Sequence, residues 1–219
     1  MIFANRAEAG RELAQQLKKY SYREDATVLG VPRGGVPVAF EVASALRLPL
    51  DIFVLGKLGV PGCEELAFGA IASGGIRILD WNIIETLGLT ALDIERVTQS
   101  EKLKLEHREH LYRGKRPPLD VSARTVILID DGMATGSSMR VAIRALREMK
   151  PTALAIAIPV APRSTCKSLR LNVDELVCLE MPEPFYAVGQ FYRDFSEVSD
   201  EEVNELLNRA WATTLMLIL

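Results

Sequence analysis

Aromatic residues and cysteine are both scarce in this sequence. Aromatic side chains make up 6% of the 219 residues, and the three cysteines are Cys63, Cys166 and Cys178. They lie far apart, with neither a C-x-x-C pair nor a cysteine–histidine spacing typical of zinc sites. Because an odd set of separated cysteines gives no basis for a disulfide framework, we expect a protein of the reducing cytoplasm.

Excess positive charge and long apolar runs are also missing. The formal net charge of −3 argues against a surface that coats nucleic acid and against a polybasic membrane anchor. Arg6 precedes any apolar run, so no signal peptide is indicated. The uncharged segment from Ala210 to Leu219 is about half the length that spans a bilayer, and we expect it to dock on the body of the protein or on a partner subunit. Neither a nucleic-acid partner nor a membrane is predicted.

The hydrophobic pattern predicts an α/β fold. Short uncharged runs rich in β-branched residues alternate with stretches of helical periodicity. The flat hydrophobicity of these runs suits strands covered on both faces, as in a parallel sheet. The expected strands are Thr27–Val31, Asp51–Leu55, Ala67–Ala72, Ile76–Leu79, Thr125–Ile129, Ala153–Val160 and Glu175–Leu179, and the expected helices are Arg6–Lys18, Val36–Leu46, Ser137–Lys150 and Asp200–Trp211.

A long charged helix is expected from Ala91 to Arg113, followed by the connector Gly114 to Pro118. Its thin apolar stripe would consist of Leu92, Val97, Leu103, Leu105 and Leu111. His107 and His110 stand three positions apart and could face one metal ion, but no third ligand is near in the sequence. A solvated helix face explains both histidines more simply.

The strongest functional signal runs from Thr125 to Leu146: an apolar strand, Asp130 and Asp131, a short loop, and an amphipathic helix. A loop at the end of a parallel strand lies where α/β sheets bind ligands. Gly132 and Gly136 permit close approach of a ligand, and the amides that open the next helix favour a phosphate. The carboxylates are placed to accept hydrogen bonds from sugar hydroxyls or to approach a divalent cation, and Thr135, Ser137 and Ser138 add hydroxyl donors.

Other interpretations of this segment are weaker. Helix capping would explain the two aspartates, and a simple turn would explain the loop. However, one side chain is enough to cap a helix, and placing two adjacent carboxylates at the end of a buried strand costs free energy. No lysine follows Gly136 as in a Walker A loop, and the G-x-G-x-x-G order of dinucleotide-binding folds is absent from the segment. Nucleoside triphosphate hydrolysis is therefore disfavoured.

The same segment resembles the signature of the type I phosphoribosyltransferases: four apolar residues, two acids and a T-G-[ST]-[ST] phosphate loop. The resemblance extends from about Asn5 to Glu202. It implies a Rossmann-like parallel-sheet core in which Asp130 and Asp131 hold the ribose hydroxyls and Mg²⁺ bridges pyrophosphate and ribose, with the two acids as candidate metal ligands. It assigns the 5-phosphate of phosphoribosyl pyrophosphate to Met133, Ala134, Thr135, Gly136, Ser137 and Ser138.

A second motif, Pro32-Arg33-Gly34-Gly35, follows the first predicted strand. Arg33 can pair with a phosphate through two parallel hydrogen bonds, and the glycines allow backbone contact with a ligand. Taken alone, the motif also has a composition typical of a simple turn without a ligand. Its position resembles the pyrophosphate loop of the family, which often contains a non-proline cis peptide, and the combination favours the functional interpretation.

The segment from Gly56 to Glu65 follows the expected strand Asp51–Leu55 and contains three glycines, a proline and Lys57. This composition predicts a mobile cover that excludes water from a reacting sugar, with Lys57 as its catalytic cation. From Lys57 to Ala70 the chain is similar to a subgroup of phosphoribosyltransferases of unassigned substrate with the pattern K-L-G-x-P-x-x-x-E-L-A-x-G-A. That subgroup usually has Arg before the Lys, whereas this chain has Gly56.

The resemblance also places substrate choice in a hood lobe at 159–193. Aromatic residues are concentrated there, and Phe185 and Tyr186 are candidates for stacking on a flat base, although aromatics in a short lobe more often form its own core. The 6-oxopurine enzymes of the family have an aspartate base where this chain has Ala134. Hypoxanthine and guanine are therefore disfavoured as acceptors.

The predicted protein is one phosphoribosyltransferase domain, with a core at about 5–158, the hood at 159–193 and a C-terminal helix and tail at 199–219. We expect a glycosyltransferase, commonly a homodimer in this family, that uses Mg²⁺ to move phosphoribose from phosphoribosyl pyrophosphate to a nitrogenous base. The alternative is a regulator or sensor that keeps the binding site without turnover. A phosphatase or hydrolase of sugar phosphates is a weaker third hypothesis, because no acid nucleophile stands in the loop order it needs.

Overall fold

The computed structural model describes residues 2–218, with side chains described as far as Thr213. Contacts divide the chain into two compact units. One unit combines Met1–Phe53 with Val121–Leu219, and the other is Val54–Asp120. The arrangement as one domain with a hood at 159–193 stays a prediction. The two compact units are defined by contacts within the chain, and they do not show whether residues 159–193 select a substrate.

A five-stranded sheet forms the centre of the unit Met1–Phe53 and Val121–Leu219. Its order is β2-β1-β6-β7-β8, and neighbouring strands pair in parallel, which confirms the predicted parallel α/β fold. Strands β1, β6 and most of β7 are buried along their length, as their unbroken apolar sequences require. The strands are β1 (Ala26–Gly30), β2 (Leu50–Ile52), β6 (Thr125–Ile129), β7 (Ala153–Val160) and β8 (Glu175–Glu180).

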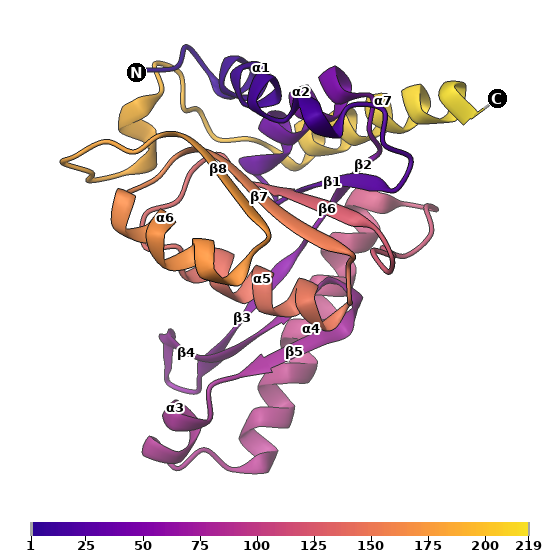
Figure 1. The fold of residues 1–219 in the computed structure, drawn as a ribbon. Helices are drawn as coiled ribbons and strands as arrows, with labels where there is room; N and C mark the ends of the chain where they lie inside the picture. The colour runs from indigo at the N-terminus through magenta and orange to yellow at the C-terminus, as the bar shows by residue number, and fades with distance from the viewer. Residues whose placement is uncertain (1, 219) are drawn as a thin grey trace. The chain divides into compact units, whose positions relative to one another are not determined.

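Helices cover both faces of this sheet. Figure 1 shows α1 (Arg6–Gln16), α2 (Gly35–Leu46) and α7 (Asp200–Ile218) over one face, and α5 (Ser137–Glu148) and α6 (Arg163–Leu169) over the other. Short 3₁₀ turns at Lys18–Tyr20, Arg170–Asn172 and Val188–Phe191 complete the connections. Two helical layers around a parallel sheet bury the apolar strands on both sides.

Helix α7 extends beyond the predicted end at Trp211 and continues to Ile218. Val203, Leu207 and Ala210 are buried, and the helix packs on α2 and β2. The side chains after Thr213 lie outside the described residues, so docking of the apolar tail stays a prediction. No helix among residues 2–218 has the length and apolarity needed to cross a membrane.

The unit Val54–Asp120 contains an antiparallel sheet, which corrects the expectation that all strands belong to one parallel sheet. Its strands are β3 (Leu55–Val60), β4 (Cys63–Ala72) and β5 (Ile76–Leu79), in the order β3-β4-β5. The links are Pro61-Gly62 and the 3₁₀ turn Ser73–Gly75. Links this short make hairpins, because a parallel connection needs a crossover of a dozen or more residues.

Two local predictions were wrong because the glycine-rich segment after β2 forms a strand and not a loop. The expected strand Asp51–Leu55 is split between β2 and β3, and the expected loop from Gly56 to Glu65 is most of a β-hairpin. Gly56, Leu58 and Val60 are buried while Lys57 is exposed, so this segment has the period of a strand despite its glycines. Gly62 has φ 78° at the turn, a conformation that glycine adopts at little cost.

Helix α4 (Ala91–Arg113) has its predicted bounds, and the short α3 (Trp81–Thr86) precedes it. Thr90 and Asp93 form a capping box at its start, and Gly114 ends it. The predicted apolar stripe was largely wrong: Leu105 is buried, but Leu92, Leu103 and Leu111 are exposed. The buried face instead follows Ile94, Thr98, Leu105 and Tyr112. The alternative of a solvated face for His107 and His110 is confirmed, because both are exposed.

Candidate phosphoribosyl site

Two of the predicted motifs meet at one edge of the parallel sheet. The Pro32-Arg33-Gly34-Gly35 motif follows β1, and Asp130 and Asp131 follow β6, the strand beside it. The amide of Val31 donates to the carbonyl of Ile129 at 2.9 Å, so the pairing continues past the strand ends. Because the strands are parallel, both motifs leave the sheet at its carboxyl edge, where ligands bind in α/β folds.

The glycines in the first motif allow this close approach. A Cβ atom at Gly34 would lie 2.1 Å from Oδ2 of Asp131, and one at Gly35 would lie 2.8 Å from the carbonyl oxygen of Ile129. Any side chain at either position would therefore push the two loops apart. The non-proline cis peptide expected in this loop is present between Pro32 and Arg33.

Arg6 holds Asp131 in place. Its Nε donates to Oδ2 of Asp131 at 2.8 Å, its Nη1 donates to the carbonyl of Ser196 at 2.8 Å, and its guanidinium lies 4.0 Å from the centre of the Phe195 ring. The two paired side chains are only 11% and 14% exposed. Sequence analysis missed this partner, because no pattern links residues 125 positions apart.

Burial changes the acid–base properties of both aspartates. Burial, and next the charge of Asp131, raise the pKa of Asp130 well above its ordinary value. Burial also raises the pKa of Asp131, although the hydrogen bond and charge of Arg6 oppose the shift. Oδ1 of Asp130 accepts from the amide of Asp131 at 2.9 Å, and the hydroxyl of Tyr192 donates to the carbonyl of Asp131 at 2.6 Å. A carboxylate paired with Arg6, beside a second carboxyl whose charged form is disfavoured by burial, suits a ligand that brings hydroxyl donors or a cation.

The loop after the aspartates presents open amides. Ala134, Thr135, Ser137 and Ser138 are exposed. Within residues 2–218, the amides of Ala134, Thr135 and Gly136 have no recorded acceptor, and that of Ser137 makes a long contact of 3.4 Å with Oγ1 of Thr135. Met133 differs, since it is buried and its amide donates to the carbonyl of Val160 at 3.1 Å. Open amides at the start of α5 form a cradle for an anion.

Neighbouring elements fix the shape of this loop. The hydroxyl of Thr165 on α6 donates to the carbonyl of Ala134 at 2.7 Å, and Nη2 of Arg140 donates to the carbonyl of Thr135 at 2.5 Å. Gly136 has φ 71°, and a Cβ there would lie 2.7 Å from Cγ2 of Thr165. Thr165 and Arg140 thus orient carbonyls away from the cradle, and sequence reasoning identified neither.

Arg33, the predicted phosphate ligand, is exposed and forms an ion pair with Glu197. Glu197 is itself largely exposed, so this pair exchanges readily with solvent and with a competing anion. The segment from Asp194 to Glu197 therefore contributes partners to both Arg6 and Arg33.

Comparison with known proteins identifies the family. The model of the phosphoribosyl transferase domain matches residues 62–196, more than half of the chain. The chain belongs to the phosphoribosyltransferase family. It is 41% identical over 209 residues to a Mycobacterium tuberculosis protein named provisionally as a phosphoribosyl transferase, an alignment that covers 95% of this chain and 47% of the relative. The chain thus spans about half the length of that relative.

A solved structure supports the fold. The crystal structure of TT1426 from Thermus thermophilus superposes with a TM-score of 0.83 at 38% identity, covering 95% of this chain and 99% of that one. A shorter match, 34% identity over 70 residues, links the chain to the bifunctional protein PyrR of Bacillus mycoides and covers 32% of this chain and 39% of PyrR. The type I fold predicted from the aspartate and loop motif is therefore confirmed.

Lys57, the predicted catalytic cation, lies on β3 in the unit Val54–Asp120. Its Nζ is 3.4 Å from Oε2 of Glu65 and 3.4 Å from the backbone carbonyl of the same residue. Both side chains are exposed, so this contact holds the lysine only weakly. Its role in catalysis stays a prediction.

The predicted stacking residues have different environments. Phe185 packs with Phe191, with ring centroids 5.2 Å apart, beside a cluster that includes Phe3 and Tyr192. Phe185 therefore fits the alternative interpretation, in which the aromatic residues of the hood form its own core. Tyr186 is 81% exposed and is the better placed of the two to meet a base.

Burial of Asp130 predicts an unusual dependence of stability on pH. Because its pKa is raised in the folded state, the folded protein is favoured below the ordinary aspartate pKa and loses this advantage as pH rises through the raised value. Asp130→Asn should therefore raise the thermal midpoint at about pH 7.5, by about 2–4 °C for each kcal/mol regained, with no gain at about pH 3. Calorimetry at several pH values measures this.

Asp174→Asn is the control with the opposite sign. The amide of Leu154 donates to the Asp174 carboxylate and lowers its pKa, so that its stabilisation is present at neutral pH and lost as pH falls. This variant should have a lower midpoint than wild type at about pH 7.5. A fall in the midpoint of Asp130→Asn at neutral pH would contradict the assigned burial effect.

Proposed function

We propose that this protein is a phosphoribosyltransferase that moves phosphoribose from phosphoribosyl pyrophosphate to a nitrogenous base. One observation carries the proposal: a pair of partly buried aspartates stands directly before a loop whose open amides begin α5. The pair suits a pentose and the cradle suits its 5-phosphate. The site needs no covalent nucleophile, because positioning and charge stabilisation supply the catalysis.

The 5-phosphate would bind at the amides of Ala134, Thr135 and Gly136, with the hydroxyls of Ser137 and Ser138 around it. The positive end of the α5 dipole adds to this attraction. Thr165 keeps the Ala134 carbonyl turned away from the anion. Ser137 and Ser138 are exposed, so their hydroxyls can rotate to suit the ligand.

Asp130 and Asp131 would accept hydrogen bonds from the ribose hydroxyls, and they also fit Mg²⁺. Mg²⁺ is bound by one or two carboxylates together with substrate phosphates and water, which matches two adjacent acids. A bound cation would neutralise negative charge on the leaving pyrophosphate. It would also favour the ionised aspartates and so offset the effect of burial on their pKa values.

In the reaction, a nitrogen of the base forms a bond with C1 of the ribose while the bond from C1 to the pyrophosphate oxygen breaks. The base loses a proton and pyrophosphate leaves as an anion. Arg33 would bind that pyrophosphate after exchanging its contact with Glu197, and Lys57 would supply a second cation. Tyr186 is the candidate for stacking on the base. A cytoplasmic location and a homodimer belong to the same proposal.

The decisive test is pyrophosphate release from phosphoribosyl pyrophosphate with Mg²⁺ and a panel of bases. Asp131→Asn should reduce kcat/KM by about 10- to 100-fold, because a charge-assisted hydrogen bond contributes about 1.5–3 kcal/mol. Chelation of the cation should stop release in wild type. Equal rates in wild type and Asp131→Asn would exclude this mechanism.

The second candidate is a sensor that binds phosphoribosyl pyrophosphate without turnover. It is favoured by Gly56, where the similar subgroup usually has Arg. Calorimetric titration would show tight binding with no pyrophosphate release for any base. A measurable turnover with one base would exclude the sensor.

A further inference from the structure

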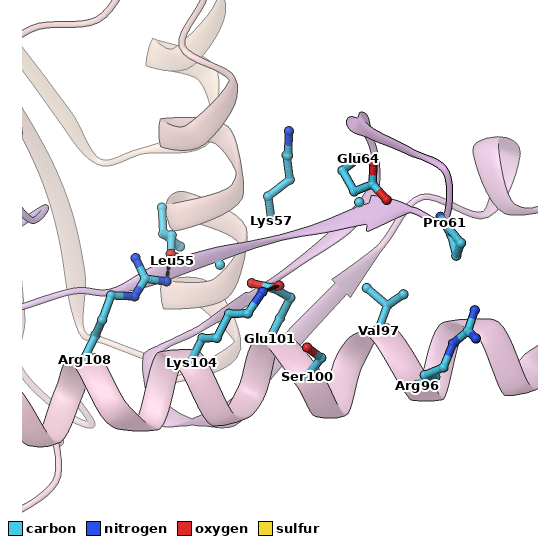
Figure 2. A pocket seen from close by; sticks show the side chains of 12 residues that line it. Leu55, Lys57, Pro61, Glu64, Arg96, Val97, Ser100, Glu101, Lys104 and Arg108 are labelled. Carbon is cyan, nitrogen blue, oxygen red and sulfur yellow. Dashed lines mark hydrogen bonds and ion pairs between the residues drawn. The ribbon is translucent and has the colours of Figure 1, made fainter.

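The unit Val54–Asp120 contains a groove between β3 and α4, shown in Figure 2. Its volume is about 570 Å³, within the range of sites for small molecules. Gly56 and Gly59 line it from β3, and polar side chains of α4 line it from the other side. Every lining residue belongs to this unit, so the groove is complete within it.

The α4 side of the groove is rich in cations. Arg96, Lys104 and Arg108 extend from the helix toward β3 (Figure 2). Nη2 of Arg108 donates to the carbonyl of Leu55 at 2.9 Å, which fixes the guanidinium at one end and leaves its other N–H groups for a ligand. Nζ of Lys104 contacts Oε1 of Glu101 at 2.7 Å. With Lys57 from β3, four lining cations face two lining carboxylates, Glu64 and Glu101, which leaves a net positive charge.

Gly56 keeps the cationic end open. A Cβ at this position would lie 2.9 Å from Cγ2 of Ile71, and it would stand 3.8 Å from Nη2 of Arg108 and 3.7 Å from Oε2 of Glu101. A longer side chain would therefore occupy the space beside both charged groups. Glycine within a strand often marks a place where a ligand approaches the backbone closely, and this position fits that pattern.

The shape of the groove indicates an elongated ligand. The lining residues Arg96, Ser100, Lys104 and Arg108 recur every four positions and so share one face of α4. They extend over roughly 18 Å of helix, far more than one phosphate needs. Three residues lie between the two cationic ends of the groove. Val97 offers an apolar contact, Ser100 offers a hydroxyl, and the backbone of Gly59 offers a flat surface.

We propose that this groove binds an organic phosphate of nucleotide size, with the phosphate on Arg108 and Lys104 and the uncharged part along Gly59, Pro61 and Val97. Glu101 and Ser100 would accept hydrogen bonds from sugar or base donors. Lys57 also lines the groove from β3, so the ligand would bind against the strand that carries this lysine. The site would thereby control the position of β3, which goes beyond transfer of phosphoribose.

The test is titration of the full chain with adenosine, guanosine, uridine and cytidine 5′-monophosphates and with inorganic phosphate, monitored by amide NMR. Ser137→Glu serves as the background, because its negative charge repels phosphate from the α5 cradle. At least one nucleotide should shift the amide signals of Gly56, Gly59 and Ser100 in this background. Absence of shifts at these amides with all four nucleotides would overturn the proposal, and so would inorganic phosphate binding as tightly as the best nucleotide.

Charge reversal on α4 supplies a matched pair. Lys104→Glu should weaken nucleotide binding by about tenfold or more, whereas Lys102→Glu should leave it within about twofold. Both lysines are exposed on the same helix, but only Lys104 lines the groove. Ser100→Leu, which fills the middle of the groove without changing charge, should also weaken binding, and circular dichroism would verify that each variant is folded. Equal losses in Lys104→Glu and Lys102→Glu would overturn the assignment. Since the readout is binding, failure of the transferase reaction would not mimic either result.

Discussion

Arg6→Met is expected to lower the free energy of unfolding by about 3–5 kcal/mol, the usual cost of removing one partner of a buried ion pair. The variant would leave the Asp131 carboxylate buried without its cation. It would also remove the donor to the Ser196 carbonyl and the contact with the Phe195 ring. Urea unfolding followed by circular dichroism measures the change.

Arg11→Met is the matched control for this prediction. Arg11 lies on the same helix α1, but its side chain is 58% exposed and its Nη1 is 3.6 Å from Oε2 of Glu41. Exposed pairs of this kind contribute about 0–1 kcal/mol, so this variant should unfold close to wild type. Similar losses in both variants would mean that the buried pair with Asp131 has no special importance.

Gly34→Ala is expected to reduce binding of phosphoribosyl pyrophosphate by about 100-fold or more, since it displaces a charged ligand-binding group that is worth several kcal/mol when correctly placed. The added Cβ would lie 2.1 Å from Oδ2 of Asp131, so the carboxylate must move and lose its geometry with Arg6. Gly34 has φ −58° and ψ −31°, which alanine adopts freely. The effect would therefore arise from space alone, and calorimetric titration with Mg²⁺ present measures it.

A double-mutant cycle separates this clash from a general disturbance of the loop. In an Asp131→Ala background the two nearest atoms that Gly34→Ala would meet, Oδ2 and Cγ of Asp131, are gone, and Nε of Arg6 at 3.4 Å is at ordinary contact distance. The substitution should then change stability by less than about 0.5 kcal/mol, whereas in wild type the two positions should be strongly coupled. An equal destabilisation in both backgrounds would show that the clash lies elsewhere.

The parallel sheet and its main site were predictable because their signals are local. Strands β6 and β7 and helix α4 have the bounds that hydrophobic patterning predicts, since an acid, a proline, a glycine or a capping residue stands close to their ends. The Asp130-Asp131 pair and the loop to Ser138 were recognisable for the same reason. A strand end, two acids and a helix start are contiguous in the chain.

Contacts between distant segments were beyond local patterns. Sequence analysis missed Arg6, Thr165 and Glu197, which contact Asp131, Ala134 and Arg33 from positions far along the chain. It also treated the glycine-rich segment around Lys57 as a loop. The alternation of buried and exposed residues on β3 becomes visible only when β4 pairs with it.

The order of residues alone therefore set strands β6 and β7, the start of α4 and the acid–glycine–hydroxyl loop, because these depend on interactions between near neighbours. The packed structure decided the partner and ionisation of Asp131, the antiparallel sheet of Val54–Asp120, and the groove beside α4. These features arise from burial and from contacts across the fold, and burial is a property of the folded chain rather than of any short segment.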